Sequence, residues 1–449
     1  MPINPADSPV FGTLYGSDAA RAVFDEGAWF GHMLDVEVAL ARVQGRLGII
    51  PAEAAAAIAQ AVTVLDAAEL AASVRNVGYP VVGVVKALSR AAGPAGAWTH
   101  WGATTQDIMD SATVLQMRAG FDLIAAELDA VIAGLAHQAR AHRATAMAGR
   151  THLQHALPVT FGLKCATWLM PLLAHRARLA QLRPRVEMVQ FGGAAGTLAS
   201  LGDRGLAVML GLAEELGLGA PLAPWHVCRD GLAEAVSYLG LVCGSLAKIA
   251  TDIVLLCQNE VAEVFEPYVP GRGQSSTMPQ KRNPIASEYI LAASRGVQAL
   301  VPLMQGAMAH DHERATGPWQ AEYLALPQAF VLTHGALAHA RTIAEGMVVD
   351  AARMRRNLDL TGGLIVAEAV MMGLAPHLGR EAAHHVVKHA CDRVIEGGAL
   401  EGGMTLTDAL MQEPEVARRL DREAVAAMTD PAAYLGAAGV FVDRVLAAV

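Results

Sequence analysis

Apolar residues recur along this chain at the spacing of an α-helix. Between residues 121 and 135 they step by three and four positions, and acidic residues fall between them, which is typical of an amphipathic helix. This stripe consists of Phe121, Ile124, Ala125, Leu128, Val131, Ile132 and Leu135. Similar patterns predict further helices at 28–47, 159–189, 231–265, 286–312 and 320–346. Because strands do not alternate with helices, the sequence predicts an all-α fold around a bundle of long helices.

Glycine and proline interrupt this pattern on both sides of the long helices. The stretches GYP at 78–80 and GP at 93–94 precede them, and TGG at 361–363 follows them. These breaks predict three domains, at residues 1–105, 106–350 and 351–449.

The composition is apolar for a chain of 449 residues. Hydrophobic residues make up 53% and charged residues 17%, and the mean hydropathy is +0.33. No stretch reaches the ~18 consecutive apolar residues of a membrane-spanning helix, and the first residues, MPINPADSPVFG, lack a secretory signal pattern. We therefore expect a cytoplasmic protein that buries its excess apolar surface between subunits.

The charge and the cysteines narrow the function further. A net charge of −9 and a pI of about 6.0 argue against nucleic acid or an anionic membrane as partner. The five cysteines are scattered and form no CxxC pair, which indicates buried thiols in a reducing compartment.

Three polar segments break the apolar pattern, each at the end of a predicted helix. They are HWGATTQDIMD at 100–110, GRTHLQHALPVTFG at 149–162 and GRGQSSTMPQKRNPIASE at 271–288. In the third, we expect the preceding helix to end at Pro267 and the next to begin with Asn283 as N-cap and Pro284 as its first residue. Hydroxyls, cations and a helix N-terminus together favour an anion site, and an ordinary exposed loop is the alternative.

The histidines and the paired threonines allow more than one interpretation. His152 and His155 suit backbone-bonded histidines better than a metal site, because no third ligand is apparent. His385 and His389, four residues apart, fit a solvated helix face. Thr104 and Thr105 are either a helix start or hydroxyl donors to a carboxylate.

Together the three segments resemble the fumarase/aspartase superfamily. Its signature loop reads close to GSSxMPxKxNP, and residues 274–284 read QSSTMPQKRNP. The other two segments resemble its first and second conserved regions in order and spacing, so the resemblance covers essentially the whole chain. It implies a three-domain all-α fold, with the signature loop at 271–284 in the central bundle domain. It also implies no metal, nucleotide or redox cofactor, and a homotetramer whose active sites combine three subunits.

Several segments resemble one branch of the superfamily, the bacterial 3-carboxy-cis,cis-muconate cycloisomerases. They are THWGATTQDIMD, SSTMPQKRNP and residues 312–328 and 362–385. This branch implies aromatic catabolism through protocatechuate and β-ketoadipate. Adenylosuccinate lyases usually carry a TRHD-like motif, whereas the corresponding NVGYPVVGVVKAL has no histidine, and ATGPWQAEY replaces their phosphate-binding segment.

The resemblance implies an intramolecular addition. One carboxylate of 3-carboxy-cis,cis-muconate attacks the alkene, and a lactone forms through an aci-carboxylate intermediate. His152 matches the family's catalytic histidine, Glu288 the acidic residue paired with it, and Ser275 the base of the elimination members. Whether His152 or Ser275 transfers the carbon proton stays open.

The remaining site residues are expected to bind the small polycarboxylate substrate. An aci-carboxylate needs preorganised positive charge and N–H donors, and a mobile loop can close over it and exclude water. The expected substrate-binding residues are Thr104, Thr105, Gln154, Ser276, Lys281 and Asn283.

Two other interpretations stay open, and one departure from the family pattern favours the first of them. Gln274 stands where the family has glycine before the paired serines. The first alternative is another lyase of the superfamily, which releases fumarate or a similar diacid from a substituted succinate. The second is a non-catalytic structural protein with this fold, as in lens crystallins, although the presence of His152, Ser275, Lys281 and Glu288 argues against it.

Overall fold

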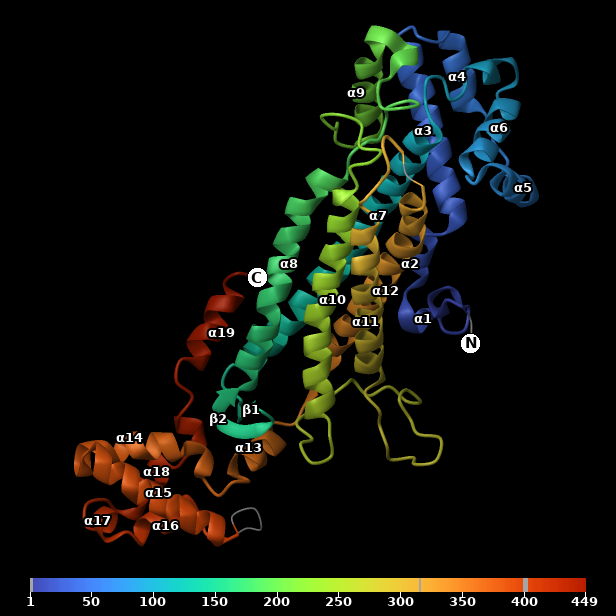
Figure 1. The fold of residues 1–449 in the computed structure, drawn as a ribbon. Helices are drawn as coiled ribbons and strands as arrows, with labels where there is room; N and C mark the ends of the chain where they lie inside the picture. The colour runs from blue at the N-terminus through green and yellow to red at the C-terminus, as the bar shows by residue number, and fades with distance from the viewer. Residues whose placement is uncertain (1–2, 315, 399–402) are drawn as a thin grey trace. The chain divides into compact units, whose positions relative to one another are not determined.

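In the computed structural model, residues 3–314, 316–398 and 403–449 are described, and helices dominate them (Figure 1). The all-α prediction is confirmed. The chain divides into two compact units, the first made of 1–129, 174–247 and 289–339, and the second of 130–173, 248–288 and 340–449. This division does not test the three predicted domains, 1–105, 106–350 and 351–449, which stay a prediction.

Five long helices contribute residues to both units. They are α7 (Thr105–Ala141), α8 (Phe161–Val186), α10 (Asp230–Leu256), α11 (Ile285–Gly306) and α12 (Pro318–Gly346). The apolar stripe at 121–135 lies on α7, and its large side chains are at most 1% exposed. The sequence pattern therefore identifies the buried face of this helix.

The first unit has its core between the N-terminal helices and α9. Its other elements are η1 (Pro5–Asp7), α1 (Gly12–Tyr15), α2 (Asp18–Val23), α3 (Glu26–Arg46), α4 (Ala52–Gln60), α5 (Ala67–Val77), α6 (Val81–Ala91), η2 (Gly93–Trp98), η3 (Ala199–Arg204) and α9 (Gly205–Leu216). Met33 of α3, Val84 of α6, Ile108 of α7 and Leu212 of α9 are fully buried in one cluster. This cluster supports the start of α7, where the first polar segment lies.

The second unit combines short helices with two antiparallel strand pairs. The strands are β1 (Ala146–Thr151), β2 (Gln154–Thr160), β3 (Val264–Phe265) and β4 (Val348–Val349), with β1 paired to β2 and β3 to β4. The helices are α13 (Ala351–Asp359), η4 (Leu364–Val366), α14 (Ala367–Leu378), α15 (Arg380–Glu396), α16 (Leu406–Met411), α17 (Pro414–Ala417), α18 (Arg422–Met428), η6 (Pro431–Ala433) and α19 (Ala438–Leu446). Val366, Val370, Leu406 and Leu410 form its buried core with Ala148 of β1.

Three predicted helices have wrong limits. The helix predicted at 286–312 ends at Gly306. The helix predicted at 231–265, and expected to run on to Pro267, ends at Leu256. The chain then turns through Ala262, which has a positive φ of 54°, before β3 begins. The helix predicted at 159–189 begins at Phe161, because the preceding residues pair as β2.

On length and composition alone, α10 is apolar enough to cross a membrane, and α13 with the η4–α14 segment would qualify only as a pair bent by 81°. Of the most apolar window of α10, 56% is buried, which is typical of the core helix of a folded protein. This pattern is therefore weak evidence for a membrane span.

Candidate active site

His152 lies at the tip of the β1–β2 hairpin. Thr151 pairs with Gln154, so His152 and Leu153 form a two-residue turn, and both have positive φ, 53° and 63°. Such turns favour Asn-Gly, and a non-glycine residue held in this conformation costs about 1–3 kcal/mol. His152 and Gln154 are exposed. The sequence predicted a helix end here, and the hairpin replaces it.

An ion pair with a buried carboxylate holds this hairpin close to its turn. Arg150 donates from both Nη atoms to the carboxylate of Glu263, at 2.9 and 2.7 Å, and the Glu263 side chain is fully buried. Asn357 Nδ2 donates to the same carboxylate at 2.8 Å. Such bidentate, charge-assisted contacts fix orientation, so the pair fixes the hairpin relative to the segment before β3.

His155 faces Arg150 across the hairpin. Burial and the charge of Arg150 lower the pKa of His155, and its Nδ1 is buried without a hydrogen-bond partner. Within the described ranges, no group of three His, Cys, Asp or Glu side chains is arranged to hold a metal ion.

The signature loop carries Ser275, Ser276 and Lys281. Ser276 and Lys281 are exposed, and Ser275 is half-buried. Ser275 Oγ accepts hydrogen bonds from the backbone N–H groups of Thr277 and Met278, at 3.3 and 3.1 Å. Two N–H donors therefore already point at the Ser275 oxygen.

Gln274 does not occupy a position that needs glycine. The residues of this loop with positive φ are Gly271, at 82°, and Gly273, at 70°. Gln274 forms an antiparallel bridge with Arg282, and a bridging residue tolerates a side chain. The departure from the family glycine therefore leaves the loop backbone unstrained at Gln274.

The N-terminus of α11 is occupied by a side chain that the sequence analysis missed. Glu266 accepts hydrogen bonds from the N–H groups of Ala286 and Ser287, at 3.1 and 2.7 Å, and from the Ser287 hydroxyl at 2.8 Å. These N–H groups are therefore not available to an anion. The capping prediction is also wrong, because α11 begins at Ile285 and Asn283 Nδ2 donates to Gly273 O at 3.2 Å.

Glu288 lies in the first turn of α11 and is exposed. Burial raises the pKa of Cys257, and the charges of Glu266 and Glu288 raise it further, which places Glu288 near this thiol. Among the described residues, no hydrogen bond or ion pair joins Glu288 to His152 or Ser275. The predicted pairing of His152 with Glu288 stays a prediction.

Thr104 and Thr105 lie in the first unit, at the start of α7. Thr104 N–H donates to Asp107 Oδ2 at 2.9 Å. Arg314 Nη1 donates to Thr104 Oγ1 at 3.1 Å, and its Nη2 donates to Ala194 O at 2.9 Å. Arg314 therefore holds this hydroxyl, a contact between residues far apart in the sequence that the pattern alone gave no sign of.

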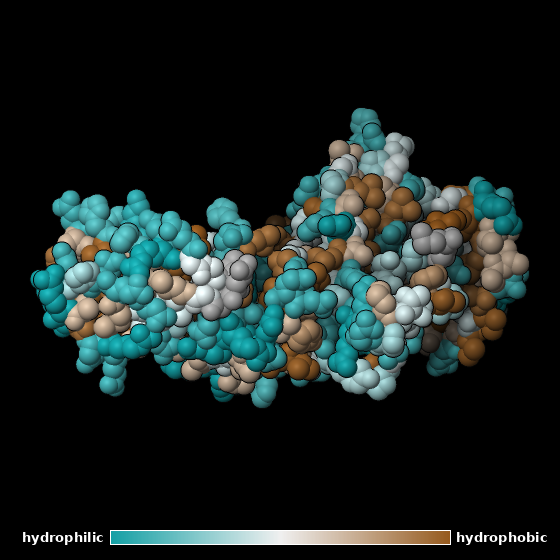
Figure 2. Space-filling model, turned by 90° about the horizontal axis from the view of Figure 1, so that it is seen from below, coloured by the Kyte–Doolittle hydropathy of each residue, from teal (hydrophilic) through white to brown (hydrophobic). Residues whose placement is uncertain are grey.

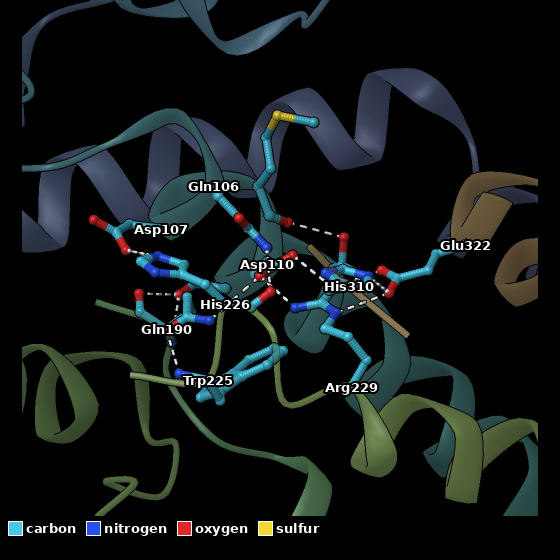
Figure 3. A network of polar contacts seen from close by, with 12 residues as sticks. Gln106, Asp107, Asp110, Gln190, Trp225, His226, Arg229, His310 and Glu322 are labelled. Carbon is cyan, nitrogen blue, oxygen red and sulfur yellow. Dashed lines mark hydrogen bonds and ion pairs between the residues drawn. The ribbon is translucent and has the colours of Figure 1, made fainter. Parts of the chain in front are cut away.

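Asp107, which accepts the Thr104 N–H, is the centre of a buried network. Figure 3 shows it beside His226. Besides Thr104 N–H, its carboxylate accepts the N–H groups of Gly192 and Gly193, at 2.8 and 2.9 Å, and contacts His226 Nε2 at 2.7 Å. A single carboxylate thus ties the threonine segment to the 192–193 turn.

One turn further along α7, Asp110 joins a second buried cluster (Figure 3). Arg229 donates to Asp110 at 2.7 and 3.0 Å and to Glu322 Oε1 at 2.8 Å, and it lies 4.9 Å from the Trp225 ring centroid. Burial alone would lower the pKa of Arg229, but the two carboxylates outweigh it and raise that pKa. His310 Nε2 lies 3.7 Å from Glu322 Oε1.

Comparison with known proteins identifies the family. A model described as lyase matches residues 15–299, and a model of the adenylosuccinate lyase C-terminus matches residues 363–445. The chain belongs to this lyase family. These matches confirm the predicted resemblance to the fumarase/aspartase superfamily.

Individual relatives match this chain over nearly their whole length. The chain is 47% identical to 3-carboxy-cis,cis-muconate cycloisomerase of Pseudomonas aeruginosa, over 98% of this chain and 96% of the relative. The crystal structure of 3-carboxy-cis,cis-muconate lactonizing enzyme from Pseudomonas putida matches with a TM-score of 0.92 and 44% identity, over 98% and 99% of the two chains. That of a fumarate lyase from Mesorhizobium sp. BNC1 matches with a TM-score of 0.90 and 48% identity, over 96% and 98%.

Proposed function

We propose that this protein closes 3-carboxy-cis,cis-muconate to its carboxymuconolactone. The observation that carries the proposal is the near full-length match to a cycloisomerase at 47% identity, together with a lactonizing enzyme of the same fold. The absence of the TRHD-like motif from this chain adds an argument against adenylosuccinate as substrate. The expected setting is aromatic catabolism in the cytoplasm.

The reaction is an addition without net oxidation or reduction. A carboxylate oxygen forms a bond to one alkene carbon, and the π electrons move to the neighbouring carbon and its carboxylate. This aci-carboxylate then takes one proton on carbon. Because no electron leaves or enters the substrate overall, the reaction requires no redox cofactor, and charge stabilisation with proton transfer is sufficient.

Lys281 is our candidate for stabilising the aci-carboxylate. It is exposed on the loop tip, where its ammonium group can reach an anion that the loop covers. Asn283 supports the loop through its contact with Gly273 O. Ser276, beside Ser275, adds a hydroxyl donor.

Ser275 and His152 are the two candidates for moving the carbon proton. The N–H groups of Thr277 and Met278 favour negative charge on Ser275 Oγ, which suits a base in the reverse direction. His152 is exposed at the strained tip of its hairpin, and strained residues cluster at functional sites. Glu288 is proposed to orient His152.

Thr104, Thr105 and Gln154 are proposed to bind the substrate carboxylates. Thr104 Oγ1 already accepts a hydrogen bond from Arg314, so its hydroxyl hydrogen is available to an acceptor. Arg314 adds a positive charge beside it.

We also propose a homotetramer with composite active sites. Large apolar side chains are exposed on the long helices, among them Met170 of α8 at 53%, Leu241 of α10 at 54% and Leu324 of α12 at 59%. Figure 2 shows hydrophobic residues lying at the surface among hydrophilic ones. Contact with other subunits would cover these faces.

A panel of substrates tests the proposal against its alternative, a lyase that releases fumarate from a substituted succinate. The fumarate lyase from Mesorhizobium supports this alternative at 48% identity. Purified protein is mixed in turn with 3-carboxymuconate, adenylosuccinate, argininosuccinate, aspartate and nitrosuccinate, and ultraviolet absorbance is followed. We expect the conjugated absorbance of the muconate to disappear fastest. Faster appearance of fumarate from any succinate would favour the alternative.

A further inference from the structure

The signature loop has a fixed stem below its tip. We define the stem as Tyr268, Gly273, Gln274, Arg282 and Asn283, and the tip as residues 275–281. Both sides of the stem belong to the second unit and lie between α10 and α11 (Figure 1).

A cation–π contact and a backbone bridge, with hydrogen bonds from Asn283, hold the stem together. The Arg282 guanidinium carbon lies 4.2 Å from the centroid of the Tyr268 ring. Gln274 and Arg282 form an antiparallel bridge. Gly273 O accepts both the N–H of Asn283, at 3.0 Å, and its Nδ2, at 3.2 Å. Each contact joins the ascending side of the loop to the descending side.

The stem also requires glycine at 273. Its φ is +70°, and a Cβ there would lie 2.7 Å from Asn283 O. Directly beyond the stem, Glu266 fixes the first N–H groups of α11. The descending side of the stem therefore runs into a helix start that is itself held in place.

The tip, in contrast, is held only by its own turns. Ser275 Oγ accepts from Thr277 and Met278, and Lys281 N–H donates to Met278 O at 3.0 Å. Among the described residues, no hydrogen bond or ion pair joins residues 275–281 to the rest of the chain. All of them except Ser275 are exposed.

We propose that Tyr268 and Arg282 form a latch that positions the loop, so that closure moves the tip alone and carries Ser275 and Lys281 to the substrate. Two cations are adjacent in the sequence, but their surroundings differ. Arg282 lies over an aromatic ring within the stem, while Lys281 lies on the tip. Arg282 is therefore a positioning residue, and Lys281 is the cation that contacts the anion. The catalytic part of this inference rests on the proposed function.

The first test uses no substrate. Trypsin acts on the native protein, and cleavage after Lys281 and Arg282 is timed by mass spectrometry in wild type, Tyr268→Leu and Tyr268→Phe. A cation–π contact at an exposed site is worth a factor of about two to five. We expect Tyr268→Leu to be cleaved about two- to fivefold faster than wild type, and Tyr268→Phe, which keeps the ring face, at the wild-type rate. Equal rates for the Leu variant and wild type, or for the Leu and Phe variants, would overturn the latch.

The second test separates positioning from direct contact. kcat and KM for 3-carboxymuconate are measured for Tyr268→Leu, Arg282→Gln and the double variant. If the two residues act as one latch, each single change lowers kcat/KM by about two- to fivefold, and the double change lowers it no further. A loss for Arg282→Gln at least tenfold larger than for Tyr268→Leu, with multiplying effects in the double variant, would mean that Arg282 contacts the substrate and would overturn the assignment.

The two tests fail independently. If wild-type protein leaves 3-carboxymuconate unchanged, the proposed function is wrong, while the tryptic comparison still decides whether the latch exists. If the muconate is converted but the tryptic rates do not differ, the latch is wrong and the proposed function stands.

Discussion

Replacing Arg229 with methionine should destabilise the first unit strongly. The Arg229 side chain is fully buried, and those of its partners Asp110 and Glu322 are each 3% exposed. Methionine has a similar length but neither charge nor donors, so the variant leaves two carboxylates buried beside each other. A buried charge that has lost its partner is among the few causes of strong destabilisation by a single substitution.

The expected magnitude follows from the burial of the three groups. Removing one partner of a buried ion pair costs about 3–5 kcal/mol, which lowers the folding equilibrium constant by a factor of roughly a hundred to several thousand. Arg143 provides a matched control, because it pairs with Asp443 while the two side chains are 47% and 54% exposed. An exposed pair contributes about 0–1 kcal/mol.

Urea unfolding, followed by tryptophan fluorescence, measures the difference. Wild type, Arg229→Met and Arg143→Met are compared, and Arg229→Lys is included as a milder variant that keeps the charge but loses the bidentate fork. Adding Asp110→Asn and Glu322→Gln to Arg229→Met should restore part of the loss, since the unpaired charges disappear. If Arg229→Met loses no more stability than Arg143→Met, the account of this cluster is wrong.

The remaining predictions concern the loop, the hairpin, the first polar segment and assembly. We expect His152→Ala to lower turnover about a hundredfold or more; near-normal turnover together with inactive Ser275→Ala would make the histidine structural. Lys281→Ala should raise KM and lower kcat for 3-carboxymuconate, unlike a change at an exposed lysine of α15. Burial alone would lower the pKa of His100, but Glu37, 2.6 Å from its Nδ1, raises it. The His100–Glu37 pair therefore stabilises the fold fully below about pH 6.5, the pKa of an unfolded histidine. This stabilisation is lost as the pH rises through the higher pKa of His100 in the folded protein. In the Glu37→Gln variant, the melting temperature should no longer fall with pH in this range. Light scattering should give a tetramer, and a stable monomer at micromolar concentration would contradict it.

The long helices could be predicted from the sequence because their periodicity is local. The stripe on α7 marks its buried face over several turns, and 26–46 and 318–346 are helical close to their predicted limits. The end of α10 was missed because no glycine or proline marks Leu256. Polar residues beyond it are held by distant partners, as Glu263 is by Arg150 and Asn357.

The sequence shows no recognisable turn motif for the hairpin that carries His152. Its turn uses His152 and Leu153 at positive φ, where Asn-Gly would have been recognisable. The chemistry of the three polar segments could be predicted from their residues. The side chains that hold these segments in place could not. Asp107, Arg229 and Glu266 each have partners between 20 and 119 residues away, which only the fold brings near.

The reaction proposed for this protein is an addition to an alkene, and its last step is protonation of a carbon atom. Conversion of 3-carboxy-cis,cis-muconate in deuterium oxide, followed by proton NMR of the product, tests this step directly. We expect a carboxymuconolactone that carries one deuterium, on the carbon adjacent to the one that bears the new carbon–oxygen bond. Unchanged muconate, or a lactone without deuterium at that carbon, would contradict the proposed reaction.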